Sequence, residues 1–222
     1  MDKKHQRHGI FISGGTGYIG THLVPELLKR GHKVTVLARK GSEHKVNPKA
    51  KILLGNPLEH ESFKGKLKLH DTFVQLAGTS HPSPWKAKKF KSVDLQAVKS
   101  SIKAIKGSSI SHYIYMSVAH PAPVMKSYLA ARIEAEKLIK KSGINATFLR
   151  PLYVLGPGHY WPYLILPFYW IFERLPATKD AANRLGLVTL NQMIKALVYA
   201  IENQGKGIKV IDVPAIRSLG GG

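Results

Sequence analysis

Three glycines, spaced three residues apart near the amino end, constrain the fold of this chain more than any other feature. Gly14, Gly17 and Gly20 follow the apolar run Ile10–Ile12 directly and precede a helix-like segment. Gly14 allows a tight turn, Gly17 lets backbone N–H groups approach a ligand, and Gly20 lets the helix pack close to the strand. Because the amino end of a helix attracts anions, the pattern predicts a site for the diphosphate of a dinucleotide.

The residues after the next strand indicate which dinucleotide binds. A second apolar run, Lys33–Ala38, follows the first helix, and Arg39 stands immediately after it. An acidic residue there grips the ribose hydroxyl of NAD, whereas an arginine suits the 2′-phosphate of NADP. We therefore expect NADP(H) in preference to NAD(H), with Lys40 as a helper. The alternative is an ordinary solvated Arg39–Lys40 pair at a strand end.

The length and composition fit a single α/β domain. The chain has 222 residues, of which 44% are hydrophobic, so we expect one core and one domain over residues 1–222. The absence of cysteine excludes disulfides and thiolate metal sites, and the dispersed histidines show no metal-ligand spacing. The basic amino end carries no apolar signal-type region, and we expect a cytoplasmic protein.

The formal net charge of +21, from 34 Lys and Arg against 13 Asp and Glu, raises polyanions as partners. The basic residues fall mostly between apolar positions of predicted helices, which is typical of solvated helix faces. No signature of a nucleic-acid-binding motif accompanies them. We expect no specific nucleic-acid partner, and peripheral contact with an anionic membrane stays open.

Apolar runs alternate with helix-like segments along most of the chain. Further strand patterns begin at Lys51, Thr72, Tyr113, Ala146 and Ile208, and apolar residues recur at helical spacing between Leu95 and Ile105, between Ser127 and Ser142, and after Leu190. Such alternation predicts an α/β fold with a doubly wound, mostly parallel sheet of the Rossmann type.

An irregular apolar segment interrupts this alternation over about residues 153–186. Its aromatic stretch from Trp161 to Phe172 is too short, and too often broken by proline, to span a bilayer. Three interpretations stay open for it. It forms a lid over an apolar substrate pocket, a patch that rests on a membrane, or a dimer contact.

Several further motifs follow the glycine turn in a fixed order. They are Leu76-Ala77-Gly78 at a strand end, Ser117 after a later strand, Tyr128 on the next helix, and Leu149-Arg150-Pro151 leading to Gly156-Pro157-Gly158. Together they resemble the short-chain dehydrogenase/reductase superfamily, and more narrowly its atypical and extended branch of NAD(P)-binding epimerase/dehydratase-like proteins. The segment Ser92–Val98 is similar to a family helix that commonly begins with Asn-Val, with Asp94 in place of the asparagine.

The resemblance implies a catalytic set with one departure from the family pattern. In that family a serine bonds the substrate oxygen, a tyrosine exchanges the proton, and a lysine four residues later supports the tyrosine. The matching residues are Ser117, Tyr128 and Arg132. The planar guanidinium of Arg132 prefers a paired anion, and Glu136 is a ready partner one helical turn further on. Either Arg132 substitutes for the lysine, or the protein binds NADP(H) without turning over a substrate.

The resemblance also implies a cofactor cradle, in which Asn56 stands where relatives often place an aspartate against the adenine. The cradle residues are Gly14, Thr16, Gly17, Tyr18, Ile19, Arg39, Asn56, Leu76, Ala77 and Gly78. The expected function is an NADP(H)-dependent oxidoreductase or epimerase-like enzyme, which passes a hydride between the nicotinamide and a small, apolar carbonyl or hydroxyl compound. The alternative is a non-catalytic NADP(H)-binding module that senses redox state or assists assembly at a membrane.

Overall fold

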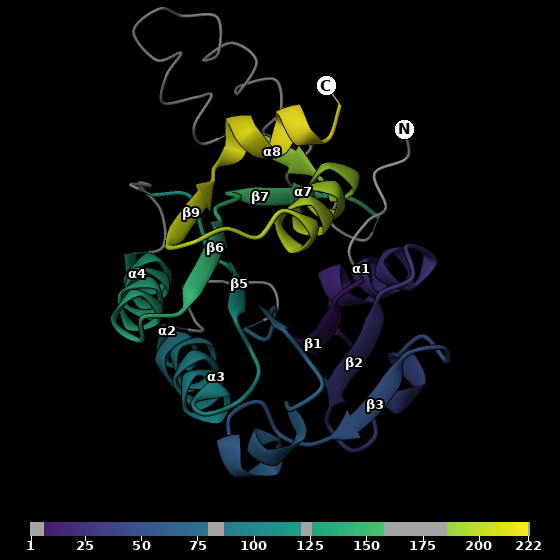
Figure 1. Cartoon of the computed structure of the whole chain (residues 1–222). Coiled ribbons are helices and arrows are strands. Elements are labelled where there is room, and N and C mark those ends of the chain that lie inside the picture. Colours follow the sequence, from purple (N-terminus) through teal and green to yellow (C-terminus); the bar gives the residue numbers. More distant parts are fainter. Residues whose placement is uncertain (1–6, 80–86, 121–125, 158–185, 222) are drawn as a thin grey trace, which may run out of the picture.

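Seven parallel strands form one twisted sheet at the centre of the molecule (Figure 1). The computed structural model describes residues 7–79, 87–120, 126–157 and 186–221. The strand order is β3-β2-β1-β4-β5-β6-β9, so the direction of winding reverses between β1 and β4. The expected doubly wound sheet of Rossmann type is confirmed. The strands are β1 (Gly9–Ser13), β2 (Lys33–Ala38), β3 (Lys51–Leu54), β4 (Thr72–Gln75), β5 (His112–Met116), β6 (Asn145–Leu149) and β9 (Ile208–Ile211).

Helices cover both faces of the sheet, because alternate residues of each strand point to opposite sides. Ile10 and Ile12 of β1 belong to a core cluster with α1 (Tyr18–Lys29) and α7 (Leu190–Glu202). Phe11, between them, belongs to a second cluster with α3 (Gln96–Ile105) and α4 (Lys126–Lys141). Figure 1 shows the two helix layers on either side of the strands.

Shorter helical segments connect several of the strands and helices. A short helix, α2 (Ala87–Lys89), runs into a π-helical segment, Phe90–Leu95, and then into α3 without a break. Single turns of 3₁₀ helix lie at Glu43–Lys45, His60–Ser62 and Lys64–Lys66. The π-helical segment carries Asp94, whose side chain is almost fully buried.

A second, two-stranded parallel sheet pairs β7 (Tyr153–Leu155) with β8 (Leu187–Thr189), and the chain ends in α8 (Val213–Leu219). Thr189 caps α7 in a reciprocal arrangement with Gln192, which fixes the change from strand to helix. The aromatic stretch from Trp161 to Phe172 lies outside the described residues. Among the helices that the structure describes, none is long and apolar enough to cross a membrane.

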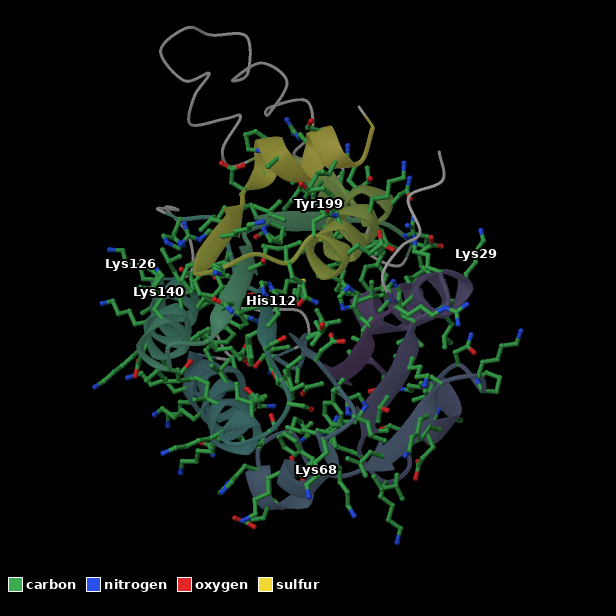
Figure 2. The ribbon with its side chains drawn as sticks, in the orientation of Figure 1. Lys29, Lys68, His112, Lys126, Lys140 and Tyr199 are labelled. Carbon is green, nitrogen blue, oxygen red and sulfur yellow. The ribbon has the colours of Figure 1, made fainter. Side chains whose placement is uncertain are left out.

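Buried polar side chains join the strands near the amino edge of the sheet. His112 of β5 is 1% exposed, and its Nε2 lies 2.9 Å from the Thr147 hydroxyl of β6 (Figure 2). Burial lowers the pKa of His112 to about 4, and the nearby charges of Lys209 and His8 act in the same direction. Burial also lowers the pKa of His32 and of His70. The folded protein therefore holds these imidazoles neutral.

This burial predicts that stability falls as the pH is lowered from about 6.5 to about 4. In that range the unfolded chain binds a proton at His112 that the folded chain does not bind, so acid favours unfolding. The His112→Gln variant keeps a polar partner for Thr147 but removes the titration. We expect the stability difference between wild type and variant to change by up to about 1.4 kcal/mol per pH unit, measured by urea unfolding. Parallel loss of stability in both proteins across this range contradicts the assignment.

Candidate functional site

The turn after β1 and the first turn of α1 have no room for side chains at three glycines. Gly14 has a φ of +85°, and a Cβ there would overlap the backbone of Leu76 and Ala77, just beyond β4. A Cβ on Gly15 would lie 2.6 Å from Val36 of β2, and one on Gly20 would overlap Gly15 itself. The tight turn expected at Gly14 is present. Gly20 was expected to pack close to the strand, but the atoms nearest to it belong to Gly14 and Gly15 of the turn. This contact brings the start of α1 directly over the strand ends.

The amino end of α1 is open to an anion. Gly17 is the N-cap, no side chain caps the helix, and its first turn contains no acidic residue. The N–H groups of that turn and the positive end of the helix dipole are therefore not satisfied by the protein's own side chains. A diphosphate group fits this geometry.

The other residues predicted around this turn lie in different surroundings. Thr16 and Gly17 are accessible, whereas the Ile19 side chain is buried in the core, so only its backbone can face a ligand. The Tyr18 ring packs on His22, and its hydroxyl lies so close to Gly156 that a Cβ there would overlap it. The end of β7 therefore borders the glycine turn.

The crevice between β1 and β4 is the point where the strand order reverses, which is where open α/β sheets bind ligands. Leu76, Ala77 and Gly78 follow β4 here and are all half-buried. Ser13 and Gln75 are register partners at these strand ends, and Ser13 Oγ and Gln75 Oε1 are buried with no hydrogen-bond partner among the described residues. Buried polar atoms of this kind are usually satisfied by a ligand or by ordered water.

Arg39 and Asn56, at the ends of β2 and β3, differ in how far they are engaged. Arg39 is exposed and forms no ion pair with the described residues. Asn56 accepts a hydrogen bond from the Leu58 N–H at 3.1 Å and donates one to Glu59 at 2.7 Å. Its side chain therefore holds the turn after β3, while Arg39 remains accessible to a ligand.

A buried ion pair connects α4 with the strand ends. Arg132 Nη2 donates to Asp94 Oδ1 at 2.7 Å, and the two side chains are 7% and 1% exposed. The other oxygen of Asp94 accepts hydrogen bonds from the backbone N–H and the hydroxyl of Thr79, at 2.9 and 2.6 Å. A Cβ on Gly78 would lie 2.8 Å from both charged groups. The pair therefore packs directly against the segment that was predicted to line the cofactor site.

The guanidinium of Arg132 also contacts two tyrosines. Nη1 donates to the Met116 carbonyl at 2.7 Å and to the Tyr115 hydroxyl at 3.3 Å, and the guanidinium carbon lies 5.0 Å from the ring centroid of Tyr128. Burial raises the pKa of Tyr115 to about 12, although Arg132 acts in the opposite direction. Burial disfavours the charged form of Arg132 and so acts to lower its pKa. Tyr115, Tyr128 and Asp94 favour the charged form, and together they outweigh burial and raise the pKa of Arg132. Arg132 is a permanent cation whose charge is applied to the Tyr128 ring.

Ser117 is engaged by a second buried carboxylate. Its hydroxyl donates to Glu136 Oε1 at 2.6 Å. Arg150, at the end of β6, donates to both oxygens of Glu136, at 2.9 and 2.5 Å. The expected pairing of Arg132 with Glu136 is therefore wrong, because Arg150 and Ser117 already occupy that carboxylate and Asp94 pairs with Arg132.

The structure thus gathers two parts of the predicted site. Arg132 contacts Tyr128, the carbonyl preceding Ser117, and the pair beneath Gly78, so the predicted catalytic set adjoins the predicted cofactor segment. The roles of Asp94 and Glu136 as partners of these residues were missed. For Asp94 a signal existed, since it and Arg132 both depart from the family pattern. Among the described residues, no cluster of three His, Asp or Glu side chains suits a metal ion.

Known proteins share much of this sequence. The sequence model of a family described as NAD(P)H-binding matches residues 14–157. A relative from Arabidopsis thaliana, chloroplast stem-loop binding protein of 41 kDa b, is 30% identical over 216 residues, which cover 87% of this chain and 54% of that protein. Ceramide reductase from Caulobacter vibrioides is 22% identical over 151 residues, which cover 67% of this chain and 47% of the reductase. The chain spans about half the length of each of these relatives.

Solved structures share the fold. The Bordetella bronchiseptica enzyme WbmH in complex with NAD⁺ superposes with a TM-score of 0.69 at 21% identity, covering 97% of this chain and 80% of that one. At this identity the likeness shows the fold alone.

The burial of the Arg132–Asp94 pair predicts a large cost for removing its carboxylate. We expect Asp94→Ala to lower the free energy of unfolding by about 3–5 kcal/mol, because the arginine charge is then left buried without its partner. Urea unfolding measures the loss. Glu134→Ala, on the exposed side of α4, is the control and should change stability by no more than about 0.5 kcal/mol. Similar losses in the two variants contradict this description of the pair.

Proposed function

Because the chain belongs to the NAD(P)H-binding family of atypical short-chain dehydrogenases/reductases, we propose that it is an NADP(H)-dependent oxidoreductase or epimerase-like enzyme. The observation that carries this proposal is the uncapped start of α1. The glycine turn before this helix packs against the end of β4 with no side chain in between. When bound there, a nicotinamide cofactor supplies or accepts a hydride. The resemblance noted from the sequence is confirmed at the level of family and fold.

The accessible side chain of Arg39 supports NADP(H) as the cofactor. Its guanidinium follows β2, where the ribose of a dinucleotide lies in this fold, and it has no acidic partner among the described residues. A planar guanidinium suits a phosphate group better than a hydroxyl. WbmH was solved with NAD⁺, which has no 2′-phosphate. The preference for NADP(H) over NAD(H) is therefore supported by Arg39 alone.

Tyr128 is our candidate for moving the proton. Its ring packs against Phe90 and under the Arg132 guanidinium, and its hydroxyl makes no hydrogen bond with the described residues. The hydroxyl is thus positioned by its ring and available to a substrate oxygen. Arg132 Nη1 and Nη2 donate to Tyr115, Met116 and Asp94, while its Nε is buried without a partner among the described residues. We assign Arg132 an electrostatic and positioning role.

The proposed substrate is an apolar carbonyl or hydroxyl compound. The residues that follow β6 and lead into the predicted substrate side are rich in aromatic and aliphatic side chains. The Caulobacter relative is a ceramide reductase, and reduction of such a compound is consistent with the proposed chemistry.

A non-catalytic NADP(H)-binding module is the second candidate, and Ser117 is the observation that favours it. The hydroxyl proton of Ser117 is directed to Glu136, so the serine cannot donate it to a substrate oxygen in this arrangement. Arg132 is likewise committed to Asp94. A protein that keeps the cradle and has lost turnover fits both contacts, and such a module would sense redox state or assist assembly at a membrane.

Turnover by Tyr128→Phe separates the two candidates. The enzyme proposal predicts that wild type oxidises NADPH with a member of a panel of carbonyls and quinones. Loss of the phenol should lower kcat by about 10²–10⁴-fold, because general acid–base catalysis contributes that much. Tyr199→Phe, on the exposed side of α7 (Figure 2), is the matched control and should keep full activity. NADPH binding without Tyr128-dependent turnover supports the module instead.

Arg39→Asp tests the cofactor preference. We expect the affinity for NADPH to fall about tenfold or more, since a charge-assisted hydrogen bond contributes about 1.5–3 kcal/mol. The affinity for NADH should rise, because aspartate can accept from the ribose hydroxyls. Fluorescence titration measures both constants, and Lys68→Asp makes the same charge change at an exposed residue on α3's side of the sheet (Figure 2). Unchanged affinities for both nucleotides in Arg39→Asp rule out the assigned role.

A further inference from the structure

A pocket of about 350 Å³ lies between α3, α4 and the 3₁₀ turn at His60–Ser62. Lys99 and Lys103 of α3, Lys141 of α4 and His60 contribute basic side chains to its lining. None of these residues belongs to the predicted cofactor cradle or catalytic set. The volume is at the lower end of the range of about 300–1,000 Å³ that small-molecule sites occupy.

The three lysines of this pocket carry uncompensated charge. Lys99 and Lys103 are four residues apart on α3, a spacing at which like charges repel. Within the part of the chain that the structure describes, no carboxylate forms an ion pair with Lys99, Lys103 or Lys141. Glu61, beside His60, is paired with Lys64 at 2.7 Å and with His60 at 3.0 Å. An anion from outside the chain would relieve this repulsion.

A buried hydroxyl in the pocket lining also lacks a partner. Ser100 is 1% exposed, and its Oγ makes no hydrogen bond with the described residues. Its neighbour Ser101 is equally buried, but its hydroxyl is bonded to the Val98 carbonyl and to the Tyr113 hydroxyl. Buried hydroxyls nearly always have a partner, so Ser100 differs from its neighbour in the way expected of a residue at a ligand site.

We propose that this pocket binds a phosphate group. Ammonium and hydroxyl donors are the groups that hold phosphate oxygens through charge-assisted hydrogen bonds. Ile102, Leu138 and the Gln96 side chain, whose Nε2 donates to the Leu58 carbonyl at 3.1 Å, also line the pocket. They leave an apolar wall and the Gln96 amide oxygen beside the phosphate for the rest of the ligand. The phosphate belongs either to a small molecule or to the backbone of a single-stranded RNA.

The surface around the pocket extends this positive charge. Lys106, just after α3, and Lys137 and Lys140 on α4 are exposed. Figure 2 shows Lys140 on the α4 side, across the molecule from Lys29 at the end of α1. Lys33 is the exposed first residue of β2, and neither Lys29 nor Lys33 lines the pocket. The two lysines provide a control pair that removes the same charge away from the pocket.

The test uses the full chain with NADPH present and two probes, inorganic phosphate followed by calorimetry and a fluorescently labelled single-stranded RNA followed by anisotropy. We expect the Lys99→Ala/Lys103→Ala variant to lower the affinity of the bound probe by about tenfold or more. The Lys29→Ala/Lys33→Ala control should have little effect. The melting temperature of the pocket variant should not fall, because a repulsive pair is removed.

The probes identify the source of the phosphate. Binding of inorganic phosphate without RNA supports a small-molecule ligand, and lysine-dependent binding of RNA supports a nucleic acid. The proposal is overturned if neither probe binds, or if the two double variants lose affinity equally, which would mean that only net charge matters. NADPH affinity should be the same in both double variants, so failure here is distinct from failure of the proposed enzyme function.

Discussion

The buried ion pair between Arg132 and Asp94 is the interaction on which the candidate site depends. It joins α4 and the π-helical segment before α3 to the loop after β4, through Thr79, and to the end of β5, through the Met116 carbonyl. Buried charges are tolerated only when paired and hydrogen-bonded. Each contact of the pair therefore fixes the position of a segment that lines the crevice, and Gly78 must lack a side chain because the pair fills the space beneath it.

The ion pair also gives one explanation for two departures from the family pattern. Asp94 stands where the resembled family commonly has an asparagine, and Arg132 stands where it has a lysine. The two residues contact each other at 2.7 Å. A carboxylate added opposite a guanidinium leaves the local charge balanced. The cation keeps its place against the Tyr128 ring, while its hydrogen bonds are directed into the protein. The proposed chemistry therefore relies on the position of the Tyr128 phenol and on the field of Arg132.

The glycine turn, the order of elements and the doubly wound sheet were predictable from sequence, because turn conformation and strand periodicity are local properties. Ser117, Tyr128 and Arg132 were proposed as a catalytic set from the family resemblance, and that assignment stays a prediction. The ion-pair partners in the site were not predictable, since Asp94 is 38 residues from Arg132 and Glu136 is 14 residues from Arg150. Helical spacing suggested Glu136 for Arg132, but the competing Arg150 directly follows β6, and only tertiary packing decides between them.

The central claim is that the open start of α1 binds the diphosphate of NADP(H), and Gly17→Asp tests it most directly. Gly17 has the extended backbone of an N-cap, and a Cβ there meets only the Gly14 carbonyl oxygen at 3.3 Å. Aspartate is a favoured N-cap, so the fold should be as stable as before while its carboxylate occupies and repels the anion site. Calorimetry should show saturable binding of NADPH to wild type and none to a folded Gly17→Asp. Absence of heat with wild type, or equal binding by both proteins, contradicts the account.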